Sequence, residues 1–404
     1  MTSPFARRVV VLGLLCVPAI GRSEDRPLQR PQTPTFRAGT DLILIDTRVV
    51  GRDGTPVAGL KPEQFEVFVD GRRRPVASAE FVRGEAAGTT GTAPANAATA
   101  GGDPRIIVLA VDEGSFPATA RASAREAATR VVDRAAGDIY LGMIAFPSGR
   151  EVAPTLDRAP MREGIAQISG VRADALAGKF NISATEATLL KSRLPGAIKE
   201  IVDRECPPFP PDPNCPQRLI HEGSTIADTL DYQGLRTLSG LHGVLDAVAP
   251  LPGRKTLIVI SAGLPLSNRP GAVSNLDAET VRIAHRAAAA NINLYVFYMN
   301  VHYLRYYSAE YGKRNNTIFE DVNLFATGLE KFADSGGGSF AQIEVNANPF
   351  VDRVLREVSS FYMVGVRTEP GDHDGKEHAI RVAVKQGGTT VRYRRFVIIP
   401  APPR

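Results

Sequence analysis

Two strand-like apolar runs of this sequence end in polar residues that could bind a ligand or a metal ion. Residues 106–111 lead directly into Asp112 and Ser115, and residues 256–260 lead into Ser261. Branched apolar runs that end in a small or acidic residue are typical of buried parallel strands, and open α/β folds keep their sites at the carboxyl edge of the sheet. Asp112, Ser115 and Ser261 are therefore candidate binding residues at such an edge.

The two edges together resemble those of a von Willebrand factor type A domain. The resemblance implies a first strand that ends in Asp-x-Ser-x-Ser. In the family these oxygen atoms, with a Thr and an Asp from later loops, hold a divalent cation that binds an acidic ligand. In this sequence only Asp112 matches, because Gly114 and Phe116 stand where the two serines belong.

The later parts of that metal site also depart from the family's pattern. Ala262 follows Ser261 at the position of the second acid, and the family's Thr is either Thr225 or Thr237. Because Mg²⁺ requires a near-octahedral set of oxygen ligands, one carboxylate offers little. We expect no metal cofactor, with Mg²⁺ at Asp112 as the alternative. Without a metal, Asp112 is expected to accept backbone hydrogen bonds or to cap the following helix.

A cluster of tyrosines follows another expected strand. Six of the ten tyrosines lie between positions 295 and 311, and four of these come after the strand expected at residues 292–299. Tyrosine is enriched in recognition surfaces because it offers a large contact area and a hydroxyl for few rotatable bonds. Tyr303, Tyr306 and Tyr307 are therefore candidates for binding a protein or glycan partner. The alternative is that these rings pack over the end of the sheet.

Few other residues are spaced for catalysis. His242 and Asp246 lie four positions apart on an expected helix, where such a pair usually stabilises the helix locally. The sequence has no Gly-x-Ser-x-Gly, His-Glu-x-x-His or Walker motif. We therefore expect a protein that is not an enzyme. The alternative is a metal-dependent hydrolase that uses Asp112, Glu113 and His242.

Several clusters of charged residues are expected to be solvated. Arginines gather at positions 72–74 and 392–395, in apparent hairpin strands, and no nucleic-acid recognition motif accompanies them. Four further residues crowd a glycine-containing turn between strands: Asp372, His373, Asp374 and His378. We expect no nucleic-acid partner.

The first residues have the pattern of a signal peptide. Arg7 and Arg8 precede an apolar run at residues 9–20, which is too short to span a bilayer but suits the core of a signal peptide. We expect residues 1–21 to be removed, which lowers the formal charge from +5 to +3. The mature protein is then expected to be periplasmic or extracellular, with no transmembrane segment.

Two cysteines remain in the expected mature chain. Cys206 and Cys215 bracket a proline-rich segment that can be neither helix nor strand. An even number of cysteines in an exported protein favours a disulfide. Zinc is the alternative, but a structural zinc site needs four ligands and only His221 lies nearby.

The elements that must position these residues alternate between strands and helices over residues 104–368. Helical patterns separate the expected strands, which lie at residues 106–111, 139–146, 256–260, 292–299 and 361–366. One helix is expected to begin with a capping box of Ser183 and Glu186. Another has one apolar face, a stripe formed by Leu235, Leu238, Leu241, Leu245 and Val248. Such alternation predicts an α/β domain with a doubly wound, mostly parallel, Rossmann-like sheet that is covered on both faces, as in type A domains.

The flanking segments have β patterns. Residues 40–83 contain Asp-Gly turns, and residues 369–404 form an apparent hairpin. Because neither has enough strands to bury a face alone, we expect the two to form one small β module. Residues 22–39 are expected to be a tether and residues 84–103 a flexible linker.

The order of elements along the whole chain resembles that of the exported von Willebrand-related proteins abundant in acidobacteria. With the resemblance and the binding residues together, we expect an exported, non-enzymatic binding or adhesion-type protein with a degenerate metal-ion-dependent adhesion site. It would recognise a protein or glycan at the carboxyl edge of the sheet without a metal. A structural component of the cell envelope is the second alternative.

Overall fold

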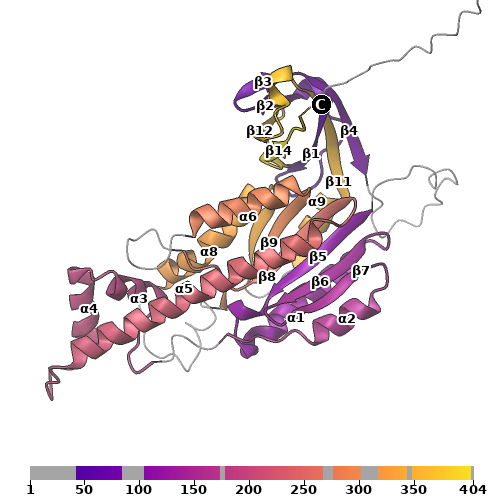
Figure 1. The fold of residues 1–404 in the computed structure, drawn as a ribbon. Coiled ribbons are helices and arrows are strands. Elements are labelled where there is room, and N and C mark those ends of the chain that lie inside the picture. Colours follow the sequence, from indigo (N-terminus) through magenta and orange to yellow (C-terminus); the bar gives the residue numbers. More distant parts are fainter. Residues whose placement is uncertain are drawn as a thin grey trace, which may run out of the picture. The chain divides into compact units, whose positions relative to one another are not determined.

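The structure is a computed structural model, and it describes residues 42–83, 104–172, 178–266, 276–301, 317–343 and 348–401. The expected signal peptide, tether and linker lie outside the described residues. The described part of the chain is a mixed α/β structure with one six-stranded sheet and two four-stranded antiparallel sheets (Figure 1).

The six-stranded sheet is mostly parallel, as predicted. From edge to edge its strands are β10 (Ser339–Ile343), β9 (Ile292–Met299), β8 (Arg254–Ser261), β5 (Arg105–Asp112), β6 (Tyr140–Phe146) and β7 (Arg150–Thr155). Every neighbouring pair is parallel except β6 with β7. The first strand of the sheet along the chain is β5, in its middle. Strands β6 and β7 then follow on one side of β5, and β8, β9 and β10 follow on the other, which is the order of a doubly wound sheet. The sequence patterns did not reveal the short edge strands β7 and β10.

Alternate side chains of the central strands enter two separate cores. In β5, Ile106 and Val108 face one core while Ile107 and Leu109 face the other. The first core also contains side chains of α5 (Cys215–Val248), α6 (Asp277–Ala289) and α8 (Ile318–Ser335). The second contains those of α1 (Arg121–Arg134), α2 (Ala159–Ala166) and α9 (Asn348–Ser359). Both faces of the sheet are therefore covered by helices (Figure 1).

Helix α5 is much longer than the apolar stripe at its carboxyl end predicts. The stripe was expected to begin at Leu235, but the helix begins at Cys215 and has 34 residues, a length of about 51 Å. Leu235 itself is exposed. The amino-terminal half of α5 packs against α3 (Ala184–Lys191) and α4 (Pro195–Glu205). Helix α3 begins with the expected capping box, in which Ser183 and Glu186 exchange hydrogen bonds.

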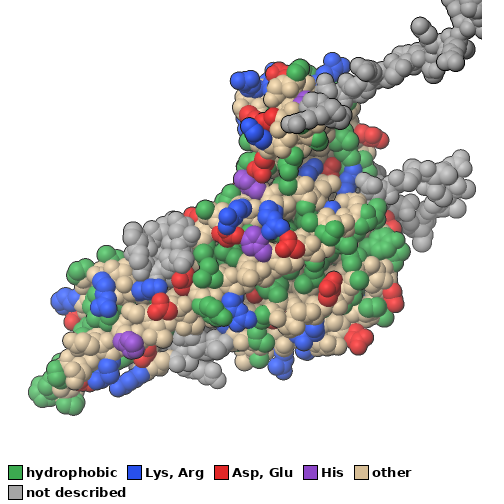
Figure 2. Space-filling model, in the orientation of Figure 1, with side chains coloured by type: hydrophobic (Ala, Val, Ile, Leu, Met, Phe, Trp, Pro, Cys, Tyr) green, Lys and Arg blue, Asp and Glu red, His purple; other side chains and the backbone are tan. Residues whose placement is uncertain are grey.

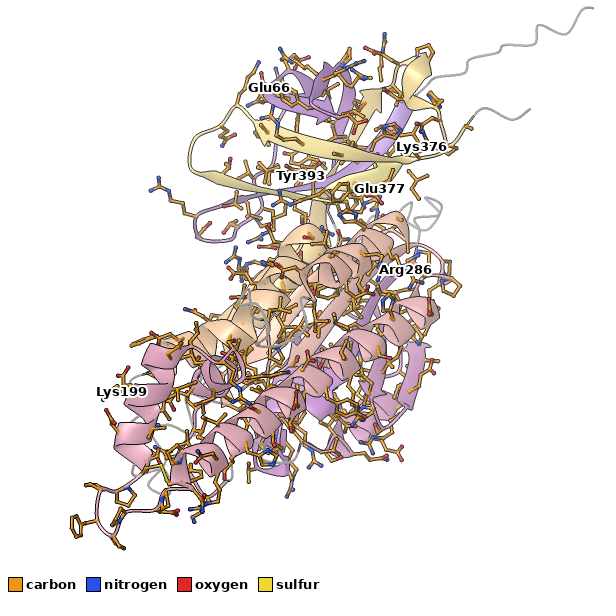
Figure 3. All side chains as sticks on the ribbon, turned by 60° about the vertical axis from the view of Figure 1, so that its left-hand side comes forward. Glu66, Lys199, Arg286, Lys376, Glu377 and Tyr393 are labelled. Atoms are coloured by element: carbon orange, nitrogen blue, oxygen red, sulfur yellow. A yellow bond between two sulfur atoms is a disulfide. The ribbon has the colours of Figure 1, made fainter. Side chains whose placement is uncertain are left out.

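A disulfide joins Cys206, just after α4, to Cys215 at the start of α5 (Figure 3). This pairing confirms the sequence prediction. The segment between the cysteines is neither helix nor strand, also as predicted. Closing so short a loop stabilises a protein by about 2–3 kcal/mol in the chain-entropy account.

The two antiparallel sheets join strands from both ends of the chain. One sheet has the order β13 (Thr389–Tyr393), β1 (Leu42–Gly51), β11 (Ser360–Arg367) and β4 (Val76–Arg83). The other has the order β14 (Phe396–Ile398), β12 (Glu377–Val384), β2 (Phe65–Val69) and β3 (Arg72–Arg74). Pairing of β12 with β2, and of β13 with β1, gives the amino-terminal strands the carboxyl-terminal partners that their apolar alternation requires. Side chains of both sheets share one core.

Strand β11 corrects one prediction. Residues 361–366 were expected to be a strand of the parallel sheet, but β11 pairs antiparallel with β1 and β4 instead. The place at the edge of the parallel sheet is taken by β10. A buried apolar run fits a central strand of either sheet, so its composition did not distinguish the two.

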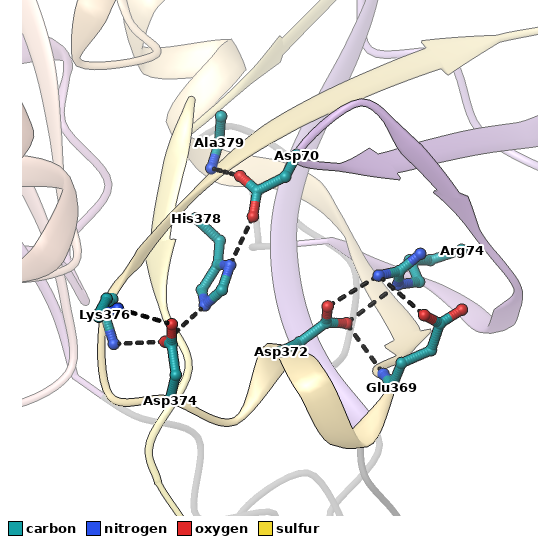
Figure 4. Close-up of polar contacts among 8 residues, drawn as sticks. All are labelled: Asp70, Arg74, Glu369, Asp372, Asp374, Lys376, His378 and Ala379. Atoms are coloured by element: carbon teal, nitrogen blue, oxygen red, sulfur yellow. Dashed lines mark hydrogen bonds and ion pairs between the residues drawn. The ribbon is translucent and has the colours of Figure 1, made fainter.

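The expectation that the charged clusters are solvated was wrong for several members. Arg74 is buried and donates two hydrogen bonds to Asp372, at 3.0 and 2.7 Å, which lowers the pKa of Asp372 to about 2 (Figure 4). His378 is buried between Asp70 and Asp374, at 2.7 and 3.1 Å. Burial opposes protonation of His378, but the two carboxylates outweigh it and raise its pKa.

The arginines of the carboxyl-terminal cluster contact helices of the α/β part. Arg392 donates to the carbonyl oxygen of Gly338 at 2.7 Å, and Arg394 donates to that of Ala288 at 3.0 Å. Arg395 holds Asp334 through both carboxylate oxygens at 2.9 Å. Arg392 and Arg394 are partly buried, whereas Arg395 remains exposed. The three arginines join the β strands to α6, to α8 and to the turn that follows α8.

The fully buried carboxylate of Glu357 on α9 lies where the two kinds of sheet meet. It pairs with Arg353 at 2.9 Å and with Arg392 of β13 at 3.3 Å, and the Tyr295 hydroxyl of β9 donates to it at 3.3 Å. The buried Arg48 of β1 donates to the Glu357 carbonyl oxygen at 3.0 Å. Through its carboxylate and its carbonyl oxygen, Glu357 thus contacts side chains of three strands, which are β13, β9 and β1.

Replacing Glu357 by Gln should destabilise the whole described fold. The change leaves Arg392 beside a neutral amide, and breaking a buried ion pair costs about 3–5 kcal/mol. Urea denaturation of Glu357→Gln and of the matched variant Glu320→Gln, at an exposed position of α8, tests this. A loss for Glu357→Gln no larger than that for Glu320→Gln would show that the pairing is dispensable.

Candidate functional site

Asp112 ends strand β5 and lies at the carboxyl edge of the six-stranded sheet. It is only 1% exposed. Its Oδ2 atom accepts hydrogen bonds from the Thr237 hydroxyl of α5 and the Ser261 hydroxyl of β8, both at 2.9 Å. The structure therefore brings together Asp112, Ser261 and Thr237. The other candidate threonine, Thr225, donates to the carbonyl oxygen of His221.

The expected role of Asp112 as a helix cap or an acceptor of backbone hydrogen bonds is corrected by these contacts. It precedes the 3-10 turn η3 (Glu113–Ser115) but makes no side-chain cap. Two hydroxyl groups satisfy it instead, because the long helix α5 places Thr237 directly over the strand end. No local sequence signal could reveal a donor 125 positions away.

Ser115 links the 3-10 turn η3 to the end of β8 through hydrogen bonds. Its hydroxyl donates to the carbonyl oxygen of Asp112 at 2.7 Å and accepts from the backbone N–H of Ala262 at 2.8 Å. Ser115 is buried, so it fixes the geometry of the edge and is covered by its neighbours. Of the candidates at this edge, Asp112, Ser115 and Ser261 all belong to one buried cluster.

Glu113 positions the loop that follows α2. Its buried carboxylate pairs with Arg150 and accepts from the Ser169 N–H at 2.6 Å. Its carbonyl oxygen accepts from the Val171 N–H at 2.9 Å, and the Phe116 carbonyl accepts from the Arg172 N–H at 3.1 Å. The backbone of Val171 and Arg172 is therefore fixed beside Asp112.

A pocket of about 400 Å³ opens beside Asp112, between the strand ends and α5. Its lining is mostly apolar and includes Phe146, Pro147, Val171 and Tyr232. Gly240 of α5 also lines it, and a Cβ atom there would lie 2.1 Å from the Phe146 ring, so only glycine allows this close packing.

The charged side chains of the pocket are two arginines and the buried Asp112. Arg172 comes from the loop after α2, and Arg236 comes from α5, where its guanidinium lies 5.7 Å from the Tyr232 ring. Sequence reasoning missed Arg172, Tyr232 and Arg236. The spacing of Thr229, Tyr232, Arg236 and Gly240 on one face of a helix was the available signal.

The electrostatics of Asp112 reflect its burial. Burial raises the pKa of its carboxyl to about 6, and the hydrogen bonds from Thr237 and Ser261 oppose this only in part. The donor set does not fit Mg²⁺, because one carboxylate oxygen already accepts two hydroxyl donors and Gly114 and Ala262 offer no side-chain oxygen. Within the described ranges, no group of three His, Cys, Asp or Glu residues is gathered as a metal site.

The remaining candidates lie elsewhere. Tyr303, Tyr306 and Tyr307 fall outside the described residues, whereas the two tyrosines of β9 are fully buried. The His242 ring contacts Glu279 and, at 2.8 Å, Arg286 of α6. Arg286, which is labelled in Figure 3, also holds Asp246. His242 and Asp246 thus join two helices, while Asp112 and Glu113 each have other partners.

No family model matches the sequence, and no curated protein matches it. Among the helices of the described residues, none has the length and apolar character needed to cross a membrane.

The raised pKa of Asp112 predicts a specific pH dependence of stability. Between about pH 4, where the carboxyl titrates in an unfolded chain, and about pH 6, the folded protein binds more protons. The contribution of Asp112 to the free energy of unfolding therefore falls as the pH rises through this window. Asp112→Asn cannot titrate there.

The wild-type protein should lose stability relative to Asp112→Asn from about pH 4 to about pH 6, and the difference should be constant above it. Urea denaturation of both proteins at a series of pH values measures this difference. Other titrating groups, such as Asp321, are present in both proteins and cancel. A difference that does not change with pH would contradict the assignment.

Proposed function

We propose that this protein is an exported, non-enzymatic binding protein of the von Willebrand factor type A kind. Its carboxyl edge would recognise an acidic group of a protein or glycan partner without a bridging metal ion. The observation that carries the proposal is the Asp112 carboxylate, which two hydroxyl groups satisfy internally, next to a pocket whose other charges are two arginines.

The geometry at the edge supports the type A assignment. Asp112, Thr237 and a residue at the end of β8 converge, as the family's Asp, Thr and second acid do. Ala262 stands at the position of the second acid, and the preceding Ser261 contacts Asp112 instead. Because the cation's ligands are missing, the chemistry of the edge must differ from that of a metal-dependent member.

Arg172 and Arg236 supply positive charge at this edge without a metal. A guanidinium group binds a carboxylate through two parallel hydrogen bonds, and aromatic and apolar neighbours strengthen the pair by excluding water. A partner that presents an acidic side chain or an acidic sugar fits this pocket. The tyrosines Tyr303, Tyr306 and Tyr307 would extend the same binding surface.

Export is supported by the disulfide between Cys206 and Cys215, since such bonds persist in oxidising compartments.

The two alternative functions, a metal-dependent hydrolase and a structural envelope component, have different structural requirements. A metal-dependent hydrolase needs Asp112, Glu113 and His242 to converge, yet each contacts a different group. A structural envelope component would bind no saturable partner.

Millimolar Mg²⁺ or Mn²⁺ should leave the melting temperature of the purified protein unchanged. A ligand stabilises the folded state only to the extent that it occupies a site there. Differential scanning fluorimetry of the wild type and of Asp112→Ala, with chelator as the reference, gives the answer. A rise that Asp112→Ala abolishes would favour the metal-dependent rival.

Reversing the charge of Arg236 should abolish capture of a partner from the envelope fraction of the producing organism. Arg236→Glu repels an acidic ligand, whereas Arg72→Glu makes the same change on exposed β3. Proteins retained by immobilised wild type and by the two variants are compared by mass spectrometry. Replacing Tyr303, Tyr306 and Tyr307 by Ser should also reduce capture. Equal capture by wild type and Arg236→Glu would reject the proposal.

A further inference from the structure

The disulfide-closed loop at the end of the α4–α5 hairpin presents an exposed aromatic side chain. Eight residues separate Cys206 from Cys215, and five of them are prolines. Phe209 lies among these prolines and is 88% exposed, the largest value among the exposed large apolar residues. Hydrophobic side chains gather at this end of the helical extension (Figure 2). Exposed apolar surface of this kind marks interaction sites.

The loop is stiff before it binds anything. Prolines and the disulfide restrict its backbone, so ordering it on binding costs little entropy. Asp212 bonds the backbone N–H of Asn214 at 3.0 Å and pairs with Arg218 at the base of the loop. Asp212 is also the only charged residue between the two cysteines.

The pocket beside Asp112 is complementary to this loop in polarity and charge. Val171 and Tyr232 at the pocket are each more than half exposed, and with Phe146 and Pro147 they form an apolar lining. A volume of about 400 Å³ accommodates a phenyl ring with neighbouring prolines. The single acid of the loop is paired with Arg218, and its carboxylate can accept further hydrogen bonds from an arginine of the pocket.

The loop cannot reach the pocket of its own chain. Both are attached to α5, and Thr229, the first pocket residue on this helix, follows Cys215 by fourteen residues. At 1.5 Å per residue the helix separates them by about 21 Å. Any loop that enters the pocket must therefore come from another molecule.

We propose that the loop Cys206–Cys215 of one copy of this chain docks into the Asp112 pocket of a second copy. Phe209 enters the apolar part and Asp212 faces Arg236. The inference rests on the proposed function and names a second copy as a partner of the same edge. Because the two contact surfaces differ, two copies that exchange their loops reciprocally form a two-fold dimer, and copies that do not exchange them reciprocally form chains or rings.

The chemistry of the loop favours a protein partner over a membrane. The loop has no basic residue, and its one charge is acidic. Arg218 at the base of the loop is paired with Asp212, so the loop offers no basic residue of its own to anionic headgroups, whereas the Asp212 carboxylate has acceptor sites left for a pocket arginine. The surface of one short loop is smaller than a standard interface, so the association is weak and requires high protein concentration.

Complementary variants test the contact in the full-length mature protein. Phe209→Ser removes the aromatic side chain and keeps the pocket, and Arg236→Glu alters the pocket and keeps the loop. Sedimentation velocity should show concentration-dependent association of the wild type. Each variant alone should associate roughly ten- to a hundredfold more weakly, since burying a phenyl side chain contributes about 1.5–3 kcal/mol.

An equimolar mixture of the two variants should form a complex of one copy of each and no larger species. The intact loop of Arg236→Glu can fill the intact pocket of Phe209→Ser, and neither molecule can extend the chain further. Phe319→Ser, which removes another exposed phenylalanine from α8, should associate as the wild type does.

A wild type that stays monomeric at all concentrations, or a mixture that forms no complex, would overturn the inference. Binding of the loop to phosphatidylglycerol vesicles without self-association would overturn it in favour of a membrane. If self-association is absent while partner capture still depends on Arg236, the inference fails and the proposed function stands. If neither depends on Arg236, both fail.

Discussion

The buried carboxylate of Glu357 is the contact on which the arrangement of the described chain depends. A charge without water must be paired, and here Arg353, Arg392 and the Tyr295 hydroxyl surround it. These partners come from α9, β13 and β9, so one buried charge can be satisfied only when both kinds of sheet are in place. Strand β11 follows α9 directly, and its place between β1 and β4 is fixed by the same helix.

Helix α5 connects the functional parts of the molecule. Its middle places Thr237 on Asp112 and presents Tyr232 and Arg236 at the pocket. Its amino-terminal end carries the disulfide-closed loop with Phe209. A rigid rod of about 51 Å keeps these features at a constant separation, because a continuous helix has no hinge.

The carboxyl edge of the sheet shows how a buried carboxylate can be held by hydroxyl groups. A buried carboxylate needs a proton, a cation or hydrogen-bond donors to offset its lost hydration. Here the donors are the hydroxyl groups of Thr237 and Ser261, and burial still raises the pKa of Asp112 to about 6. Because the Oδ2 atom of Asp112 accepts hydrogen bonds from within the fold, the proposed recognition falls to the arginines and apolar side chains at the surface.

The sequence by itself determined the elements whose patterns are local. The apolar runs of β5, β8 and β9 predicted a mostly parallel sheet, the capping box predicted the start of α3, and the paired cysteines predicted the disulfide. The Asp-Gly turn at Asp70 and the apolar alternation of β12 predicted flanking strands that need each other.

Only the tertiary structure decided which strand joins which sheet and which side chains meet. β11 has a composition that suits either sheet, and the pairing of Arg74 with Asp372 joins residues 298 positions apart. Thr237 and Asp112 are likewise 125 positions apart in the sequence, and the pocket arginines Arg172 and Arg236 come from separate segments. Such contacts depend on how the chain returns in space, and the free energy of burying a charge or a polar group acts only after those segments have come together.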